Sequence, residues 1–200
     1  MILLLKIYFV FGQQKVIVID PGHGGKDSGA IGVNSIQEKD VELGIAKEIL
    51  RLNKTLLNNE FDIFLTRYKD TLISLSDRTK LAKILNADLF ISLHCNHSDN
   101  PKARGIEVYV SKNEYRNSKE SVWFAYQLQN QIKKQLGFQS RGVKFADFQV
   151  LRETVDCCSS LLLELGFLSN WDENRYYNNS SGIRTVAFVL MRRLIKIREL

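Results

Sequence analysis

The amino-acid sequence predicts a single α/β domain in which helices cover both faces of a mostly parallel, twisted sheet of about six strands. Three observations support this prediction. Strand-like apolar runs alternate with helical periodicities along almost the whole chain. Most of these runs are continuously apolar, as expected of strands that are covered on both sides. The 200 residues contain no internal repeat and no linker, so one domain accounts for them.

The first half of the chain holds three expected strands and two expected helices. Residues 16–20 are a β-branched run that stops at a glycine-rich loop. Apolar residues recur with mostly helical spacing over residues 38–57, and residues 61–66 are the second strand-like run. A helix is expected over residues 74–86, with a serine or threonine cap near its start, before a third strand at residues 88–94.

The second half continues the alternation. Alternating polar and apolar residues at 105–110 predict a fourth strand, and residues 118–136 have helical spacing. Residues 142–151 are expected to form irregular extended chain with a strand at its end. Residues 161–165 are a further apolar strand, and a closing helix is expected from residue 180 onward.

The N-terminal residues form an apolar run that Lys6 interrupts once. The run is shorter than the about 20 apolar residues that a membrane span requires. Residues 1–14 are therefore predicted to be a signal peptide or leader, with residues 15–200 as the folded domain. An N-terminal edge strand is the alternative, and cleavage stays open. The leader predicts a periplasmic or secreted protein with no stable membrane insertion after its removal.

The net charge of +6 and the pI of about 9.2 favour anionic partners such as nucleic acids, acidic lipids or wall polymers. Nucleic-acid binding needs basic and aromatic residues clustered on one face, and no such stripe occurs, so no nucleic-acid partner is expected. Cys95, Cys157 and Cys158 lack C-x-x-C spacing and are too few for a disulfide framework. We expect them to be mostly buried apolar residues.

Four metal-competent side chains are placed to meet at one edge of the predicted sheet. His23 lies three residues past the first strand, His94 ends the third, and Glu164 lies near the end of the last. Glu38 opens the first long helix after a loop. In open α/β sheets, ligands bind at the carboxyl ends of the strands. The four side chains are therefore expected to form one site.

Two imidazoles and one carboxylate that leave a position open are the ligand set of a catalytic zinc site. A second carboxylate nearby is suited to act as general base on a metal-bound water. Taken alone, His94 would be a core histidine, and Glu38 would be an acidic residue that favours a helix N-terminus. Glu164 is harder to explain structurally, because an ionised carboxylate inside an apolar run is costly unless it is paired or metal-bound. Residue chemistry leaves open which glutamate binds the metal and which is the base.

Several motifs in one order resemble the zinc-dependent type 3 family of N-acetylmuramoyl-L-alanine amidases. They are VIDPGHGG at 18–25, EKD at 38–40, FISLHCN at 90–96 and LLELGFLSN at 162–170. The resemblance implies that His23, Glu38 and His94 hold zinc and that Glu164 is the catalytic glutamate. It also implies that the substrate is peptidoglycan, cut at the amide between N-acetylmuramic acid and the L-alanine of the stem peptide. Residues 15–200 would then be the catalytic domain.

Neighbouring polar residues have expected supporting roles. Asp20 and Asn96 flank the ligands and are candidates for holding an imidazole in place. Arg104 and Arg141 are candidates for pairing with substrate carboxylates. His97 is expected to point away from the metal, so it is left out of the ligand set.

The segment between the fourth expected strand and Arg141 bears on regulation. Its about thirty residues suffice for one ordinary helix. Some members of the family that this chain resembles carry an extra helix there, which blocks the zinc until a partner removes it. The sequence leaves no room for such an insert, so an open site that needs no activator protein is predicted.

Competing functions make distinct demands on the sequence. A zinc peptidase or deacylase on a related scaffold would cut another amide, and analysis of the products separates it from an amidase. A non-catalytic wall-binding module would be expected to lack a metal ligand or the base, whereas all four residues are present.

Overall fold

The computed structural model describes residues 14–196, so the predicted leader at residues 1–14 lies almost wholly outside the described residues. Six strands form one sheet in the order β2-β1-β3-β6-β4-β5. The strands are β1 (Val16–Pro21), β2 (Asp62–Leu65), β3 (Leu89–Asn96), β4 (Ile106–Ser111), β5 (Ser140–Ala146) and β6 (Ser159–Phe167). All neighbouring strands are parallel except β4 and β6, which are antiparallel. The predicted six-stranded, mostly parallel sheet is confirmed.

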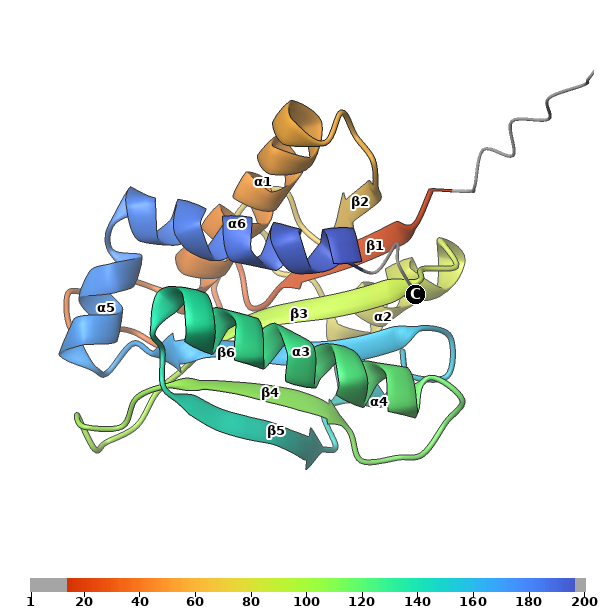
Figure 1. Cartoon of the computed structure of the whole chain (residues 1–200). Coiled ribbons are helices and arrows are strands. Elements are labelled where there is room, and N and C mark those ends of the chain that lie inside the picture. Colours follow the sequence, from red (N-terminus) through yellow and green to blue (C-terminus); the bar gives the residue numbers. More distant parts are fainter. Residues whose placement is uncertain (1–13, 197–200) are drawn as a thin grey trace, which may run out of the picture.

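Helices cover both faces of this sheet (Figure 1), as predicted. They are α1 (Glu38–Leu56), α2 (Leu75–Ile84), α3 (Ser118–Leu136), α4 (Gln149–Arg152), α5 (Trp171–Tyr177) and α6 (Ser180–Ile195). The long helices α1, α3 and α6 pack over one face and enclose the larger core. The short helices α2 and α4 cover the other face over a smaller core. Within residues 14–196, none of the helices has the length and apolarity to cross a bilayer.

The alternation of side chains along the central strands decides which face carries the polar residues. In β3, Leu89, Ile91 and Leu93 point into the larger core, whereas Phe90 points into the smaller one. His94 follows Phe90 by an even number of residues, so it projects from the same face as Phe90. That face is covered only by the short helices, which leaves room beside the ends of the strands.

Two short helices depart from the expected elements. Extended chain ending in a strand was expected through residue 151, but α4 occupies its last part, so that expectation was wrong. A single helical turn has no period to detect, and Val150 and Leu151 are both buried, which resembles a strand in sequence. Helix α5 was not expected. Its start signal is Asn170, whose side chain accepts from the backbone N–H groups of Asp172 and Glu173.

Candidate metal centre and active site

A buried ion pair fixes the loop that carries the first histidine. Arg78 and Asp20 are 2% and 1% exposed, and Nη1 of Arg78 lies 2.7 Å from Oδ1 of Asp20. Nη2 of the same guanidinium donates to the carbonyl oxygen of His23. Asp20 also accepts from the hydroxyl groups of Thr66 and Ser92. Its oxygens are therefore taken up by these groups and hold no imidazole, contrary to the supporting role expected for Asp20.

Replacing Asp20 with alanine should lower the free energy of unfolding by about 3–5 kcal/mol, because Arg78 would remain buried without its counter-charge. Urea denaturation followed by circular dichroism measures this loss. The matched control is Lys15→Ala, which removes the exposed ion pair with Asp88 and should cost less than about 1 kcal/mol. Equal losses in the two variants would show that burial of the Asp20 pair adds nothing.

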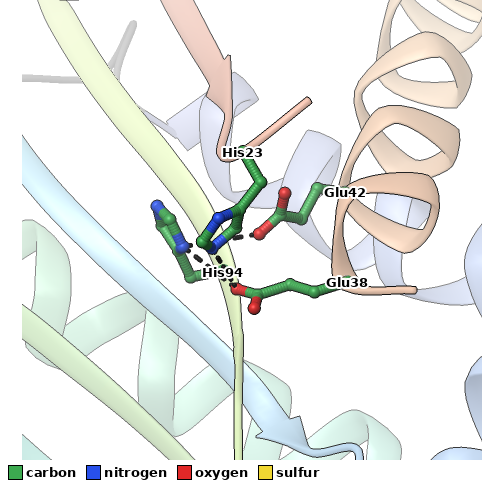
Figure 2. Close-up of side chains that lie close together, drawn as sticks. All are labelled: His23, Glu38, Glu42 and His94. Atoms are coloured by element: carbon green, nitrogen blue, oxygen red, sulfur yellow. Dashed lines mark hydrogen bonds and ion pairs between the residues drawn. The ribbon is translucent and has the colours of Figure 1, made fainter. Parts of the chain in front are cut away.

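The two predicted histidine ligands both face one carboxylate oxygen of the third predicted ligand, Glu38. Oε1 of Glu38 lies 3.2 Å from Nε2 of His23 and 3.0 Å from Nδ1 of His94 (Figure 2). The same oxygen accepts the backbone N–H of Cys95, and Oε2 accepts that of Ala30. Burial raises the pKa of Glu38, but hydrogen bonds from the two imidazoles outweigh burial and hold it well below its usual range. Glu38 is therefore an anion aimed at both rings.

These separations test whether the residues fit a metal ion. Zinc–nitrogen and zinc–oxygen bonds of about 2.0–2.1 Å in a tetrahedral site place neighbouring donor atoms about 3.3 Å apart. The donors of His23 and His94 lie at 3.2 and 3.0 Å from the donor of Glu38. Because the donor types and their spacing both match, the three residues fit a zinc site.

A fourth side chain joins this cluster that the sequence analysis did not select. Glu42 is fully buried, and its Oε1 lies 3.5 Å from Nδ1 of His94. One ligand atom from each of His23, Glu38, Glu42 and His94 lies within 4.8 Å of all the others. The signal for Glu42 is its position four residues after Glu38, which places both carboxylates on one face of α1.

The carboxylate of Asp27 orients the ring of His23. Oδ2 of Asp27 lies 2.9 Å from Nδ1 of His23, which leaves Nε2 facing Glu38. Burial lowers the pKa of His23, but hydrogen bonds and charges from Glu38 and Asp27 outweigh it and raise the pKa.

Two glycines of the loop pack directly against predicted ligands. A Cβ atom at Gly22 would lie 2.3 Å from Cε1 of His94, and one at Gly29 would lie 2.5 Å from Oε2 of Glu38. Only glycine allows the loop to pack this closely against the ligands.

The expected base lies beside the cluster. Glu164 in β6 pairs in register with His94 in β3, so both side chains project from the same face of the sheet. Oε2 of Glu164 is buried without a hydrogen-bond partner among the described residues. Burial raises the pKa of Glu164 to about 7. At neutral pH, the carboxyl group of Glu164 is thus close to the midpoint between its protonated and its ionised form.

His23, His94 and Glu164 all line one cavity of about 800 Å³. Its apolar wall comes mainly from the segment that precedes and begins α2, from α4 and from β6, with Leu72, Ile73, Leu75, Phe148, Val150 and Leu162. Charged and polar side chains, among them Asp27, Asp77 and Arg78, line the rest of the cavity. A cavity of this size that combines an apolar wall with polar groups is typical of a site that binds a small molecule or a polymer segment.

A family model described as N-acetylmuramoyl-L-alanine amidase matches residues 17–192. The chain belongs to this family. The amidase LytC of Bacillus subtilis (strain 168) is 40% identical over 157 residues, which are 78% of this chain and 30% of that protein. The matched part of this chain therefore spans less than a third of the length of that relative.

Solved amidase structures share the fold. The catalytic domain of CwlV, an N-acetylmuramoyl-L-alanine amidase from Bacillus (Paenibacillus) polymyxa var. colistinus, is 33% identical with a TM-score of 0.83. The match covers 93% of this chain and 99% of that one. The CwlD amidase of Clostridioides difficile, solved in complex with the GerS lipoprotein, has a TM-score of 0.81 at 24% identity. That match covers 92% of this chain and 98% of CwlD.

In this domain of the amidase family, the row of paired residues continues past Glu164, the expected base. Glu107 in β4 pairs in register with Glu164 and is 3% exposed. It forms ion pairs with Arg141 and Lys144 and accepts a hydrogen bond from the hydroxyl group of Tyr109. Arg141, a candidate for pairing with substrate, is thus bound to Glu107.

The remaining candidates lie apart from the predicted ligands in this fold. Nη1 of Arg104 lies 3.7 Å from Oδ2 of Asp172 at the surface. His97 is exposed beyond the end of β3 and is not part of the four-residue cluster. Asn96 accepts from the backbone N–H of His97. The imidazole of His23 is supported by Asp27 instead, a loop residue that no periodicity distinguishes.

Proposed function

We propose that this chain is a zinc-dependent hydrolase of bacterial peptidoglycan that cuts the amide between N-acetylmuramic acid and the L-alanine of the stem peptide. The observation that carries the proposal is the convergence of His23, Glu38 and His94 on one point beside Glu164. Membership of the amidase family supports the choice of bond and substrate. The basic net charge of +6 is compatible with the carboxylates of stem peptides.

The proposed roles follow from the contacts of each residue. His23, Glu38 and His94 would hold the zinc, and bound zinc supplies Lewis acidity and a water of lowered pKa. Asp27 accepts a hydrogen bond from Nδ1–H of His23, which leaves the lone pair of Nε2 free to bind the metal. Glu164 takes the proton of the attacking water and passes it to the leaving nitrogen. The carbonyl carbon gains an oxygen and loses the nitrogen, so a lactyl carboxylate and a free L-alanine amine result.

Digestion of purified peptidoglycan followed by mass spectrometry tests this assignment. An amidase releases stem peptides that begin with a free L-alanine amine and leaves the glycan strands intact. A zinc peptidase would release shorter peptides from within the stem, and a deacylase acting on the sugars would release acetate. Either of the last two product sets, without free L-alanine termini, would contradict the proposal.

The rate should fall on acidification through the titration of Glu164. A general base works only when deprotonated, so a group with its pKa raised to about 7 loses activity as the pH drops below that value. A bound cation next to His94 opposes the effect of burial, so the midpoint should lie at or below about 7 in the zinc-loaded enzyme. Values of kcat/KM measured from pH 5 to pH 9 check this prediction. A rate that rises as the pH falls across this range would contradict it.

We also propose that the enzyme acts outside the cytoplasm, in the periplasm or after secretion, because peptidoglycan lies there. An open site that needs no activator protein is a further proposal. It is supported by the single helix α3 between β4 and β5, since none of the cavity-lining residues comes from α3. Adding candidate partner proteins to purified enzyme and peptidoglycan should leave the rate unchanged. A large stimulation would contradict this proposal.

A further inference from the structure

We propose that Glu42 is a fourth protein ligand of the metal, so that two imidazoles and two carboxylates hold it. This inference rests on the metal-dependent function proposed above and adds a residue to its centre. Figure 2 shows the carboxyl groups of Glu38 and Glu42, from successive turns of α1, pointing toward the rings of His23 and His94.

The first argument is the state of the Glu42 carboxyl group. The residue is 0% exposed, and neither of its carboxylate oxygens has a hydrogen-bond partner among the described residues. A carboxylate that is removed from water without compensation is strongly destabilising, and proteins satisfy such groups by pairing or by metal binding. Burial raises the pKa of Glu42 well above its usual range, so it is the ionised form of this carboxyl group that calls for a cation.

The nearest protein cation does not satisfy this need. Nη2 of Arg67 lies 3.7 Å from Oε2 of Glu42, which is longer than a hydrogen bond. The same nitrogen donates to the carbonyl oxygens of Gly22 and Lys39, each at 2.7 Å. Arg67 thus holds the backbone on either side of the site, and its charge only partly offsets that of Glu42. Oε1 of Glu42 still faces the cluster.

Position and distance place Oε1 in the metal centre. Its separation of 3.5 Å from Nδ1 of His94 is close to the 3.0 Å between that nitrogen and Glu38. Both values approach the spacing of about 3.3 Å between neighbouring donors of a zinc ion. Glu38 and Glu42 do not line the cavity, whereas both histidines do. The carboxylates would thus bind from the protein side and leave the cavity side open for water and substrate.

A second carboxylate has a chemical consequence. Two carboxylates balance the charge of a divalent cation, whereas Glu38 alone leaves a net positive centre. We therefore expect metal to bind more tightly with Glu42 present. Removal of an outer partner of a ligand costs about 10–100-fold in metal affinity, so loss of a true ligand should exceed that range.

The test compares the wild type with Glu42→Gln, and Glu48→Gln serves as the matched control. Glu48 lies on the same helix and pairs with Arg51 away from the cluster. Zinc affinity is measured by competition with a chromophoric chelator, and the visible spectrum of the cobalt-substituted protein reports on the ligands. We expect Glu42→Gln to weaken zinc binding by more than about 100-fold and to change the cobalt spectrum. Glu48→Gln should change neither.

An unchanged cobalt spectrum in folded Glu42→Gln would overturn the inference at any affinity, because the ligand set would be the same without Glu42. Should the variant not fold, crystals of the wild type soaked in zinc decide the matter. Oε1 of Glu42 should lie about 2.0–2.2 Å from the ion, and a distance beyond about 3 Å would overturn the inference. Peptidoglycan cleavage by a wild type without a Glu42 ligand would leave the proposed function standing.

Discussion

Replacing Glu164 with glutamine should reduce the release of stem peptides from purified peptidoglycan by about 10²–10⁴-fold, the usual contribution of a general base. Glutamine has nearly the same shape but accepts no proton at neutral pH. Glu164 lies beside His94 in the sheet and lines the cavity, yet it is not one of the four clustered residues that could hold a metal ion. The Glu164→Gln variant should therefore still bind zinc.

Peptide release and zinc content of Glu164→Gln are measured on the same preparation. Glu114→Gln is the matched control, because Glu114 is exposed on the surface and the chemical change is identical. It should keep wild-type activity. Cleavage at the wild-type rate by Glu164→Gln would remove Glu164 from the mechanism, and loss of its zinc would make it a ligand instead.

Replacing His94 with alanine should weaken zinc binding by at least roughly 100-fold and abolish cleavage at micromolar zinc. A four-ligand zinc site contributes about 10–16 kcal/mol, so one ligand accounts for about 2.5–4 kcal/mol, which is roughly 70- to 900-fold in affinity. The stabilisation that zinc gives the folded protein should fall with the affinity, since it depends on the ratio of free zinc to Kd.

Equilibrium dialysis and the shift of Tm with added zinc measure the effect in His94→Ala. His97→Ala is a close control, because His97 is exposed three residues further along the chain and outside the cluster. It should retain the affinity and Tm shift of the wild type. Loss of zinc from His97→Ala, with retention by His94→Ala, would reverse the assignment of the two histidines.

Much of the site was predictable from the sequence because strands and helices fix the directions in which their side chains point. A polar residue near the end of a buried apolar strand lies close to the carboxyl edge of the sheet, and both His94 and Glu164 have that pattern. The register that pairs them directly was not predictable, because it depends on β6 lying next to β3 although 62 residues separate the two strands. The fold class needed only the alternation of elements, whereas the strand order needed the structure.

Other contacts depend on tertiary structure that local pattern does not contain. Asp20 was expected to support an imidazole, but the fold places Arg78 against it from a helix 58 positions away. Glu42 was not selected from the sequence, and it is buried because α1 begins against the loop of His23 and the end of β3. Asp27 lies in a loop, where sequence periodicity carries no information about side-chain direction.

The most direct test of the central claim is the dependence of product formation on metal. Purified peptidoglycan is digested by the wild type as prepared, after removal of metal by a chelator, and after zinc is added back. Mass spectrometry then counts peptides with a free L-alanine amine. We expect such peptides from the first and third samples and a near-complete loss from the second. Equal release of these peptides from all three samples would contradict the account.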